Sequence, residues 1–133
     1  MRASLSALRG EKGDAHEGIT LEFVDPTNGE PVLPTLTYGA QLLRAREETA
    51  LKRETSSTVF VVMEGRGQTE VAGRTFDWEE NDIFVIPNFL WRRHVAGGKD
   101  AVLYTMSDRP LLEKIGQYRA QGMAGGKVTQ IVA

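Results

Sequence analysis

Short β-branched and aromatic segments, separated by tight turn signals, constrain the fold of this chain more than any other feature of its sequence. Gly, Asn, Asp and Pro gather between the segments, and these residues favour the backbone angles of tight turns. Strands so short and so regularly spaced are typical of an antiparallel barrel or sandwich. The expected strands of this series cover residues 58–63, 68–71, 74–78, 83–86, 91–95 and 101–107.

The chain before this series is less regular. Residues 1–18 are polar and contain several glycines, so we expect an N-terminal arm with little core. Residues 19–24 alternate well enough to form one more strand, which stops at a dense turn signal. Leu42 and Leu43 are expected to be core residues within a mixed segment.

The chain after the series changes its pattern. Asp108 suits a helix N-cap, and Pro110 is tolerated in a first helical turn. Apolar residues then recur at helical spacing, which predicts a C-terminal helix over about 108–121 whose apolar face packs on the barrel. The last residues, 127–133, suit an edge strand, so residues 19–133 are expected to form one all-β barrel domain with a C-terminal helix.

Composition excludes several classes of function. A length of 133 residues suits one domain, and 16 Lys and Arg against 18 Asp and Glu lack the basic excess that nucleic-acid binding requires. The chain has no Cys and only two His, which excludes disulfide scaffolds, thiolate nucleophiles and Cys-type zinc sites. No apolar run approaches the roughly 20 residues of a membrane helix. The N-terminus has no apolar signal region, so the expected location is the cytoplasm.

The stretch from residue 54 to 96 resembles the two-part signature of the cupin superfamily. Gly65 matches the glycine that closes the first motif, and Pro87 matches the proline of the second. Asn81 stands on the glycine that opens the second motif, and Asn tolerates a left-handed turn better than most residues. This resemblance implies a single cupin, or jelly-roll, barrel.

Most of the chain is also similar to the C-terminal cupin domain of the gentisate 1,2-dioxygenases. Those enzymes are bicupins that use Fe(II) and O2 to open the ring of dihydroxybenzoate-type substrates. The order and spacing of the similar segments make the resemblance specific. These segments are residues 25–35, 55–60, 64–67, 84–87, 101–110 and 113–119.

The metal-binding residues of the family are replaced at the matching positions of this chain. The two histidines of the first motif fall on Lys52 and Glu54, its glutamate falls on Thr58, and the histidine of the second motif falls on Arg92. A lysine ammonium and an arginine guanidinium donate hydrogen bonds and accept none, so neither ligates iron at neutral pH. The four inherited positions supply a single carboxylate, whereas a mononuclear Fe(II) oxygenase typically needs two imidazoles and a carboxylate. We therefore expect no metal cofactor.

An ion pair is expected in place of the metal. Residues two apart on a strand point to the same side. Lys52 therefore shares a side of its strand with Glu54, and Arg92 shares a side of its strand with His94. If the barrel closes as in cupins, Glu54 and Arg92 face each other across the interior and form a partly buried ion pair, with Lys52 nearby. His94 is expected to be a hydrogen-bonded pocket or surface histidine, with a ligand role beside Glu54 as the alternative. The candidate pocket residues are Lys52, Glu54, Thr58, Phe60, Arg92 and His94.

Three functions stay open on this reading. The first is a metal-free structural or regulatory cupin, not an enzyme on its own, that forms a homodimer or pairs with another cupin chain. The second is a binder of small aromatic carboxylates, held in the barrel by Lys52, Arg92 and His94. The third is an active Fe(II) ring-cleaving dioxygenase of aromatic catabolism.

Overall fold

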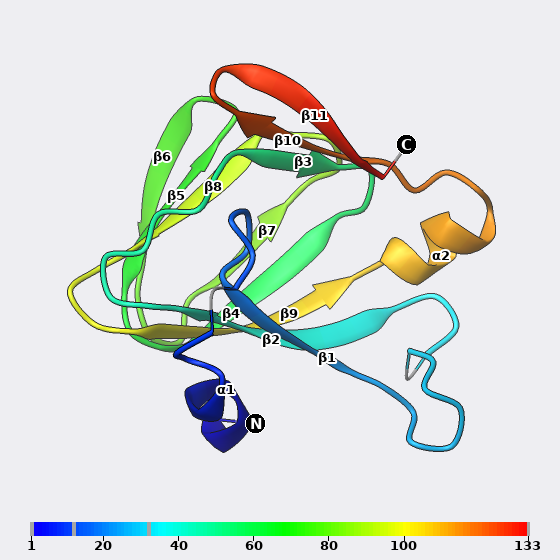
Figure 1. The fold of residues 1–133 in the computed structure, drawn as a ribbon, viewed down its shortest axis with the longest axis horizontal. Helices are drawn as coiled ribbons and strands as arrows, with labels where there is room; N and C mark the ends of the chain where they lie inside the picture. Colours follow the sequence, from blue (N-terminus) through cyan, green and yellow to red (C-terminus); the bar gives the residue numbers. More distant parts are fainter. Residues whose placement is uncertain (1, 12, 32, 133) are drawn as a thin grey trace.

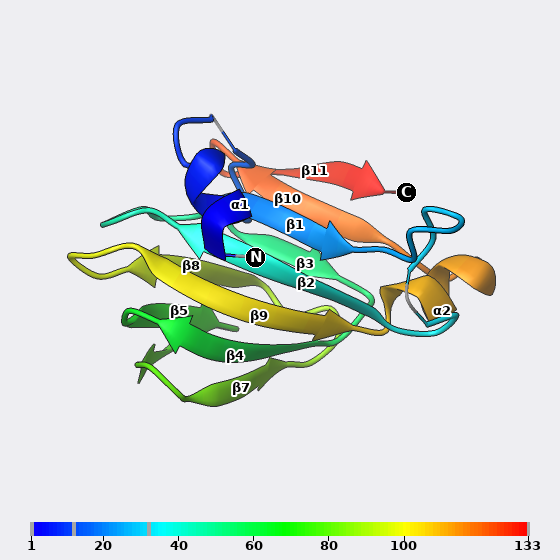
Figure 2. The same cartoon turned by 90° about the horizontal axis from the view of Figure 1, so that it is seen from below.

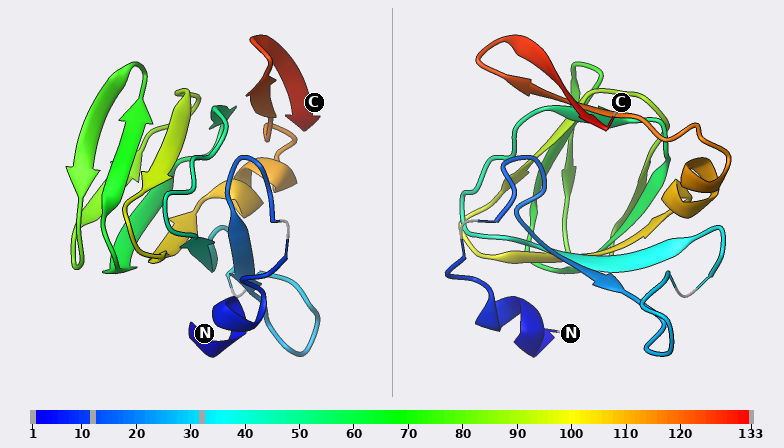
Figure 3. Two further views of the ribbon diagram at one scale, coloured as in Figure 1. Left: turned by 60° about the vertical axis from the view of Figure 1, so that its left-hand side comes forward. Right: turned by 45° about the vertical axis from the view of Figure 1, so that its right-hand side comes forward.

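Two antiparallel sheets form most of this protein, whose computed structural model describes residues 2–11, 13–31 and 33–132. The five-stranded sheet has the order β1-β2-β9-β4-β7, which Figure 2 shows side by side. The sheets face each other and enclose the interior of a barrel (Figures 1 and 3). The five strands are β1 (Ile19–Phe23), β2 (Thr37–Leu43), β9 (Ala101–Ser107), β4 (Thr58–Glu64) and β7 (Ile83–Ile86).

The second sheet has the order β11-β10-β3-β8-β5-β6. Its edge strand β11, the last of the chain, pairs with β10, and the hairpin they form stands at the top of Figure 1. This confirms the edge strand expected near the C-terminus. The six strands are β11 (Lys127–Val132), β10 (Ala120–Ala124), β3 (Lys52–Glu54), β8 (Arg92–Ala96), β5 (Gly67–Val71) and β6 (Arg74–Trp78).

The structure confirms the predicted series of strands. The sequence could predict these strands because residues in the turns between them specify the turns locally. Strands β6, β7 and β9 have the predicted bounds, β4 and β5 are each longer by one residue, and β8 is shifted by one residue along the chain. Asn81 adopts a φ of 75°, the left-handed conformation expected at this position of the signature. Gly65 has a φ of 84°, and a Cβ there would lie 2.7 Å from the carbonyl oxygen of Asp100. Glycine is therefore required at that turn.

The C-terminal helix is much shorter than predicted. Helix α2 spans only Arg109–Lys114, and Gly116, at a φ of 71°, redirects the chain soon after it. The helix packs poorly: Ile115 at its end is 57% exposed. The chain then continues into β10, which pairs with β3. Residues 117–119, which the predicted helix included, lie between α2 and β10 and belong to neither.

The N-terminal arm contributes more to the core than its composition suggests. Residues Arg2–Ala7 form a short helix, α1, which lies beside β1 and β2 in Figure 2. The Leu5 side chain is fully buried and packs with Ile19, Leu42 and Val102 on the outer face of the five-stranded sheet. Among the described residues, no helix is long and apolar enough to cross a membrane.

The barrel interior changes from polar to apolar along its strands. On β4 the buried residues run from Thr58 through Phe60 to Val62, and on β8 they run from Arg92 through His94 to Ala96. The apolar end holds the main core cluster, and the polar end holds the candidate site. The core cluster consists of Leu43, Phe60, Val62, Trp78, Ile86, Ala96, Ala101 and Leu103.

Candidate functional site

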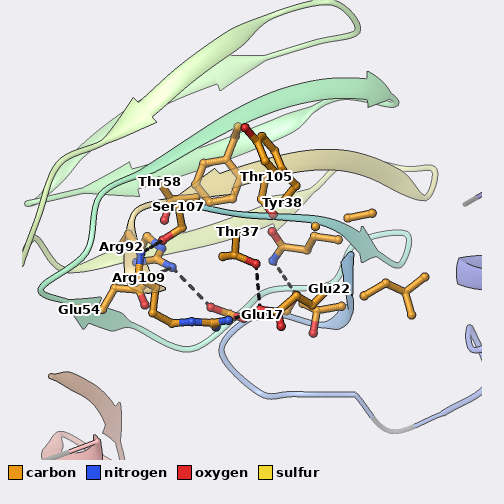
Figure 4. A pocket seen from close by; sticks show the side chains of 16 residues that line it. Glu17, Glu22, Thr37, Tyr38, Glu54, Thr58, Arg92, Thr105, Ser107 and Arg109 are labelled. Atoms are coloured by element: carbon orange, nitrogen blue, oxygen red, sulfur yellow. Dashed lines mark hydrogen bonds and ion pairs between the residues drawn. The ribbon is translucent and has the colours of Figure 1, made fainter. Parts of the chain in front are cut away.

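A cavity of about 120 Å³ lies at the polar end of the barrel (Figure 4). Hydroxyl groups of Thr37, Thr58 and Ser107 form one row of its wall, because these residues pair with one another across β2, β9 and β4. Phe60 also lines the cavity and separates it from the apolar core. The charged residues of the lining are Glu17, Glu22, Glu54, Arg92 and Arg109.

The ion pair between Glu54 and Arg92 is present. The Arg92 Nη2 donates to Glu54 Oε1 at 2.7 Å, and each side chain is only 7% exposed. Its geometry differs from the expectation in one respect. The two residues do not face each other across the interior, because β3 and β8 are neighbours in one sheet, with Lys52 directly opposite Arg92.

A second carboxylate joins this pair from the N-terminal arm. Glu17 Oε1 accepts a hydrogen bond from Lys52 Nζ at 2.6 Å and lies 3.5 Å from Arg92 Nη2. Figure 4 shows the Glu17 side chain reaching toward Arg92. The two cations and two carboxylates therefore form one network with no net formal charge. We refer to Glu17, Lys52, Glu54 and Arg92 as the charge network.

The second carboxylate oxygen of Glu54 is also occupied. Tyr118 donates its hydroxyl to Glu54 Oε2 at 2.7 Å. Burial opposes ionisation of Glu54, but the charges of Arg92 and Lys52 and these hydrogen bonds outweigh it and lower its pKa from 4.5 to about 2. Burial and the neighbouring Glu54 raise the pKa of Tyr118. Glu54 is therefore ionised near pH 7 while Tyr118 keeps its proton.

His94 belongs to the apolar core. It is 1% exposed, its ring packs edge-on against Phe60 with the centroids 5.0 Å apart, and it is not among the described residues that line the cavity. Its Nδ1 lies 2.8 Å from Thr69 Oγ1, which accepts a hydrogen bond from Trp78 Nε1. Burial, and then the charge of Arg92, lower the pKa of His94 to about 3. The ring is therefore neutral near pH 7.

A second ion pair closes another side of the cavity. Arg109 contacts Glu22 directly, and Thr37 donates its hydroxyl to the same carboxylate at 3.0 Å. Arg109 and Glu22 are about one-third exposed, so this pair lies nearer to solvent than the charge network. The sequence reasoning did not select either residue.

The structure thus brings most of the predicted site residues together. Glu54, Thr58, Phe60 and Arg92 line the cavity, and Lys52 joins them through the charge network. The sequence reasoning missed Glu17 and Tyr118. Glu17 gave no signal because it lies in a polar arm, and Tyr118 lies within the predicted helix range of 108–121 but beyond the end of α2.

The residues at the positions that the resemblance assigns to metal ligands do not fit Fe(II). Lys52 and Arg92 present cationic donors, and both oxygens of Glu54 already accept hydrogen bonds. In the part of the chain that the structure describes, no three His, Asp or Glu side chains form a group able to hold a metal ion. A mononuclear iron site needs several neutral or anionic ligands with open positions beside them.

Comparison with known proteins identifies relatives over almost the whole chain. The chain is 40% identical over 99% of its length to a 5-aminosalicylate 1,2-dioxygenase of Comamonas sp and 34% identical over 89% to a gentisate 1,2-dioxygenase of Aquipseudomonas alcaligenes. It covers 36% and 34% of these proteins, about a third of the length of each. No family model matches the sequence.

Solved structures give the same result. A salicylate 1,2-dioxygenase from Pseudoaminobacter salicylatoxidans, solved as its gentisate adduct, matches 92% of this chain with a TM-score of 0.82 and 32% identity. The chain covers 34% of that structure. The cupin domain of Schizosaccharomyces pombe Cnp3 shares the fold, with a TM-score of 0.58 over 74% of the chain at 19% identity. The chain therefore has the all-β barrel fold of a cupin domain, and it is similar to the gentisate and salicylate 1,2-dioxygenases over about a third of their length.

Proposed function

We propose that this dioxygenase-like cupin binds no metal and serves as a structural or regulatory domain that pairs with a second cupin. The charge network carries the proposal. It puts a lysine and an arginine at positions where the resemblance implies histidine ligands, and it uses both oxygens of the one remaining carboxylate. A cation entering there would meet Lys52 and Arg92 at short range and would lose the attraction of Glu54. We also propose the cytoplasm as its location.

Iron loading tests the metal-free assignment. The chain is incubated anaerobically with Fe(II), desalted, and analysed for bound iron and for O2 uptake with gentisate. We expect far less than one iron per chain and no O2 uptake. The matched comparison is the variant K52H/E54H/T58E/R92H, which restores the ligand residues of the family. One tightly bound iron in the unaltered chain, with O2 uptake on gentisate, would instead establish an active dioxygenase.

The outer face of the five-stranded sheet supports the pairing role. Two rows of apolar side chains cross all five strands, and the strand register sets them side by side. At the β7 edge, Ile83 is 68% exposed and Val85 is 55% exposed. Most of the other side chains in these rows are half-buried, and an apolar face that is partly open to solvent in this way marks an interaction site. The rows are Leu21, Ala40, Tyr104, Val61 and Ile83, and Phe23, Tyr38, Met106, Val59 and Val85.

A second copy of the chain suits this face. The face carries both a ridge, Ile83 and Val85, and a neighbouring groove of about 410 Å³ that includes Tyr38, Val61 and Tyr104. A two-fold axis that runs along β4 would place the ridge of each copy over the groove of the other. A two-fold interface requires self-complementarity of this kind.

Sedimentation velocity measures this pairing. We expect a dimer that V85K weakens at least tenfold, because a lysine would be buried in an apolar interface. V128K is the matched control, since Val128 is also exposed but lies on β11. A monomeric chain at tens of micromolar, or equal effects of the two substitutions, would contradict self-association and leave another cupin chain as the partner.

The cavity favours a second candidate function, the binding of small aromatic carboxylates. Arg92 and Arg109 line it, and a guanidinium matches the geometry of a carboxylate. A titration with salicylate and gentisate tests this role. Saturable binding that R92K weakens would support the role, and an affinity that R92K leaves unchanged would contradict it.

A further inference from the structure

The position of the Glu17 carboxylate at the cavity depends only on the rotation of its side chain. This arrangement suggests how ligand access to the site is controlled. The main chain of the arm is anchored to the barrel independently. Gln41 Nε2 donates to the carbonyl oxygen of Glu17 at 2.6 Å, and the amide of Ala50 donates to that of Ala15 at 2.7 Å. A tight turn, closed by paired hydrogen bonds between Asp14 and Gly18, fixes the segment between them. Rotation of the Glu17 side chain therefore requires no movement of the backbone.

Burial differs sharply between the carboxylate and its cations. The Lys52 and Arg92 side chains are 12% and 7% exposed, whereas Glu17 is 30% exposed. Glu17 thus reaches in from the solvent side, and its carboxylate can regain water after a rotation. The two cations cannot, because the strands β3 and β8 hold them inside the barrel.

Charge balance defines what could replace Glu17. Glu54 neutralises Arg92, and Glu22 neutralises Arg109, so Glu17 is the counter-charge of Lys52. Departure of the Glu17 carboxylate leaves one positive charge in a poorly solvated site. A ligand with a single carboxylate restores neutrality, whereas a neutral molecule does not.

The size of the cavity limits the rest of the ligand. Its volume of about 120 Å³, enlarged by the space that the Glu17 side chain leaves, is close to the roughly 150 Å³ that holds one benzene ring. Phe60 offers an apolar surface, and Thr58 and Ser107 offer hydroxyl groups. A small monocarboxylate with at most one ring fits these limits.

We propose that Glu17 is a resident carboxylate that occupies the anion position of the cavity, and that a small external monocarboxylate binds Lys52 and Arg92 by displacing it. This inference rests on the binding role proposed above as the second candidate, and it adds the control of that site. The arm then competes with the ligand, so affinity depends on how firmly Glu17 is held.

The test is a calorimetric titration with benzoate, with benzamide as the uncharged probe. We expect E17Q to bind benzoate at least tenfold more tightly than the unaltered chain, and E17Q/K52M to lose that gain. Benzamide should bind neither. E11Q is the matched control, because Glu11 lies in the same arm and is exposed. If E17Q proves too unstable to titrate, E17D keeps the charge but shortens the side chain, and we expect it to raise affinity as well.

The outcomes separate this inference from the role on which it rests. Benzoate binding that is equal in the unaltered chain, E17Q and E17D would overturn the displacement while leaving the binding role standing. Binding to E17Q that survives K52M would overturn the assignment of Lys52. No benzoate binding to any variant would exclude both the displacement and the binding role.

Discussion

The two ends of the barrel interior are built on the same strands but are stabilised differently. On β4, Thr58 at one end and Val62 at the other lie on the same face, only four residues apart. At the apolar end most side chains pack without directional partners, although Trp78 donates a hydrogen bond to Thr69, and the cluster around Leu103 is buried. At the polar end each charge has a named partner at hydrogen-bond distance. Phe60 is the boundary, since it belongs to the core cluster and also lines the cavity.

This contrast teaches what buried charges require that an apolar core does not. An apolar core tolerates many similar side chains, because burial is non-directional. A buried charge is tolerated only when it is paired and hydrogen-bonded. The charge network satisfies this requirement with residues of β3, β8 and the arm. The stability of the two ends should therefore respond differently to substitution.

The largest expected effect comes from breaking the buried ion pair. R92M leaves the Glu54 carboxylate buried without its main cation, and we expect it to lower the free energy of unfolding by about 3–5 kcal/mol. Urea denaturation at pH 7 measures this change. The double variant R92M/E54L removes both charges, and we expect it to recover most of the loss.

A matched change at the apolar end should behave otherwise. L103A is expected to cost about 2–5 kcal/mol through lost burial and a cavity, with no charge to rebalance. A loss below about 1 kcal/mol in R92M, or no recovery in the double variant, would show that the polar end is not stabilised by its pairing.

Acid should weaken the polar end through protonation of Glu54, and comparison with E54Q isolates this effect from that of other groups. The pKa of Glu54 is lowered to about 2 from 4.5, so its ionised form stabilises the fold above about pH 4.5. That stabilisation, on the order of 3 kcal/mol, is lost as the pH falls through the range from 4.5 to 2. E54Q lacks it at every pH. The difference in unfolding free energy between the unaltered chain and E54Q should therefore shrink between pH 5 and pH 3. A difference that stays constant over that range would contradict the shifted pKa.

A smaller effect is expected at the boundary of the two ends. T69V removes the hydroxyl between Trp78 and His94, which leaves the buried Trp78 N–H and the His94 Nδ1 without partners. We expect a loss of about 1–3 kcal/mol in urea denaturation at pH 7. T69S keeps the hydroxyl and should be the less destabilised of the two. The reverse order would show that the methyl group of Thr69 matters more than its hydrogen bonds.

The smallest effect is expected from an exposed ion pair. Arg66 lies 3.8 Å from Glu79, and the two side chains are 79% and 66% exposed. R66A should change the free energy of unfolding by less than about 0.5 kcal/mol, because solvent screens such pairs. A loss comparable to that of R92M would mean that burial is not what distinguishes the charge network.

The sequence by itself determined the strands and the presence of the ion pair. Strands such as β7 and β9 are bounded by residues that specify turns locally, and Asn81 and Gly65 take the left-handed angles that their residue types allow. The resemblance to cupins then located Glu54 and Arg92 at one end of the barrel. The strands and turns depend on short segments of sequence, and the location of Glu54 and Arg92 depends on the spacing of the cupin motifs.

Only the tertiary structure decided which residues complete the site. Glu17 contacts Arg92 across 75 positions of the chain, and Tyr118 reaches Glu54 across 64. No local pattern encodes such contacts, because they depend on where the arm and the segment after α2 pack on the finished barrel. The same reason explains the short C-terminal helix, since pairing of β10 with β3 outweighed a weak helical pattern. Propensity acts within a few residues, and long-range packing decides where local preferences are weak.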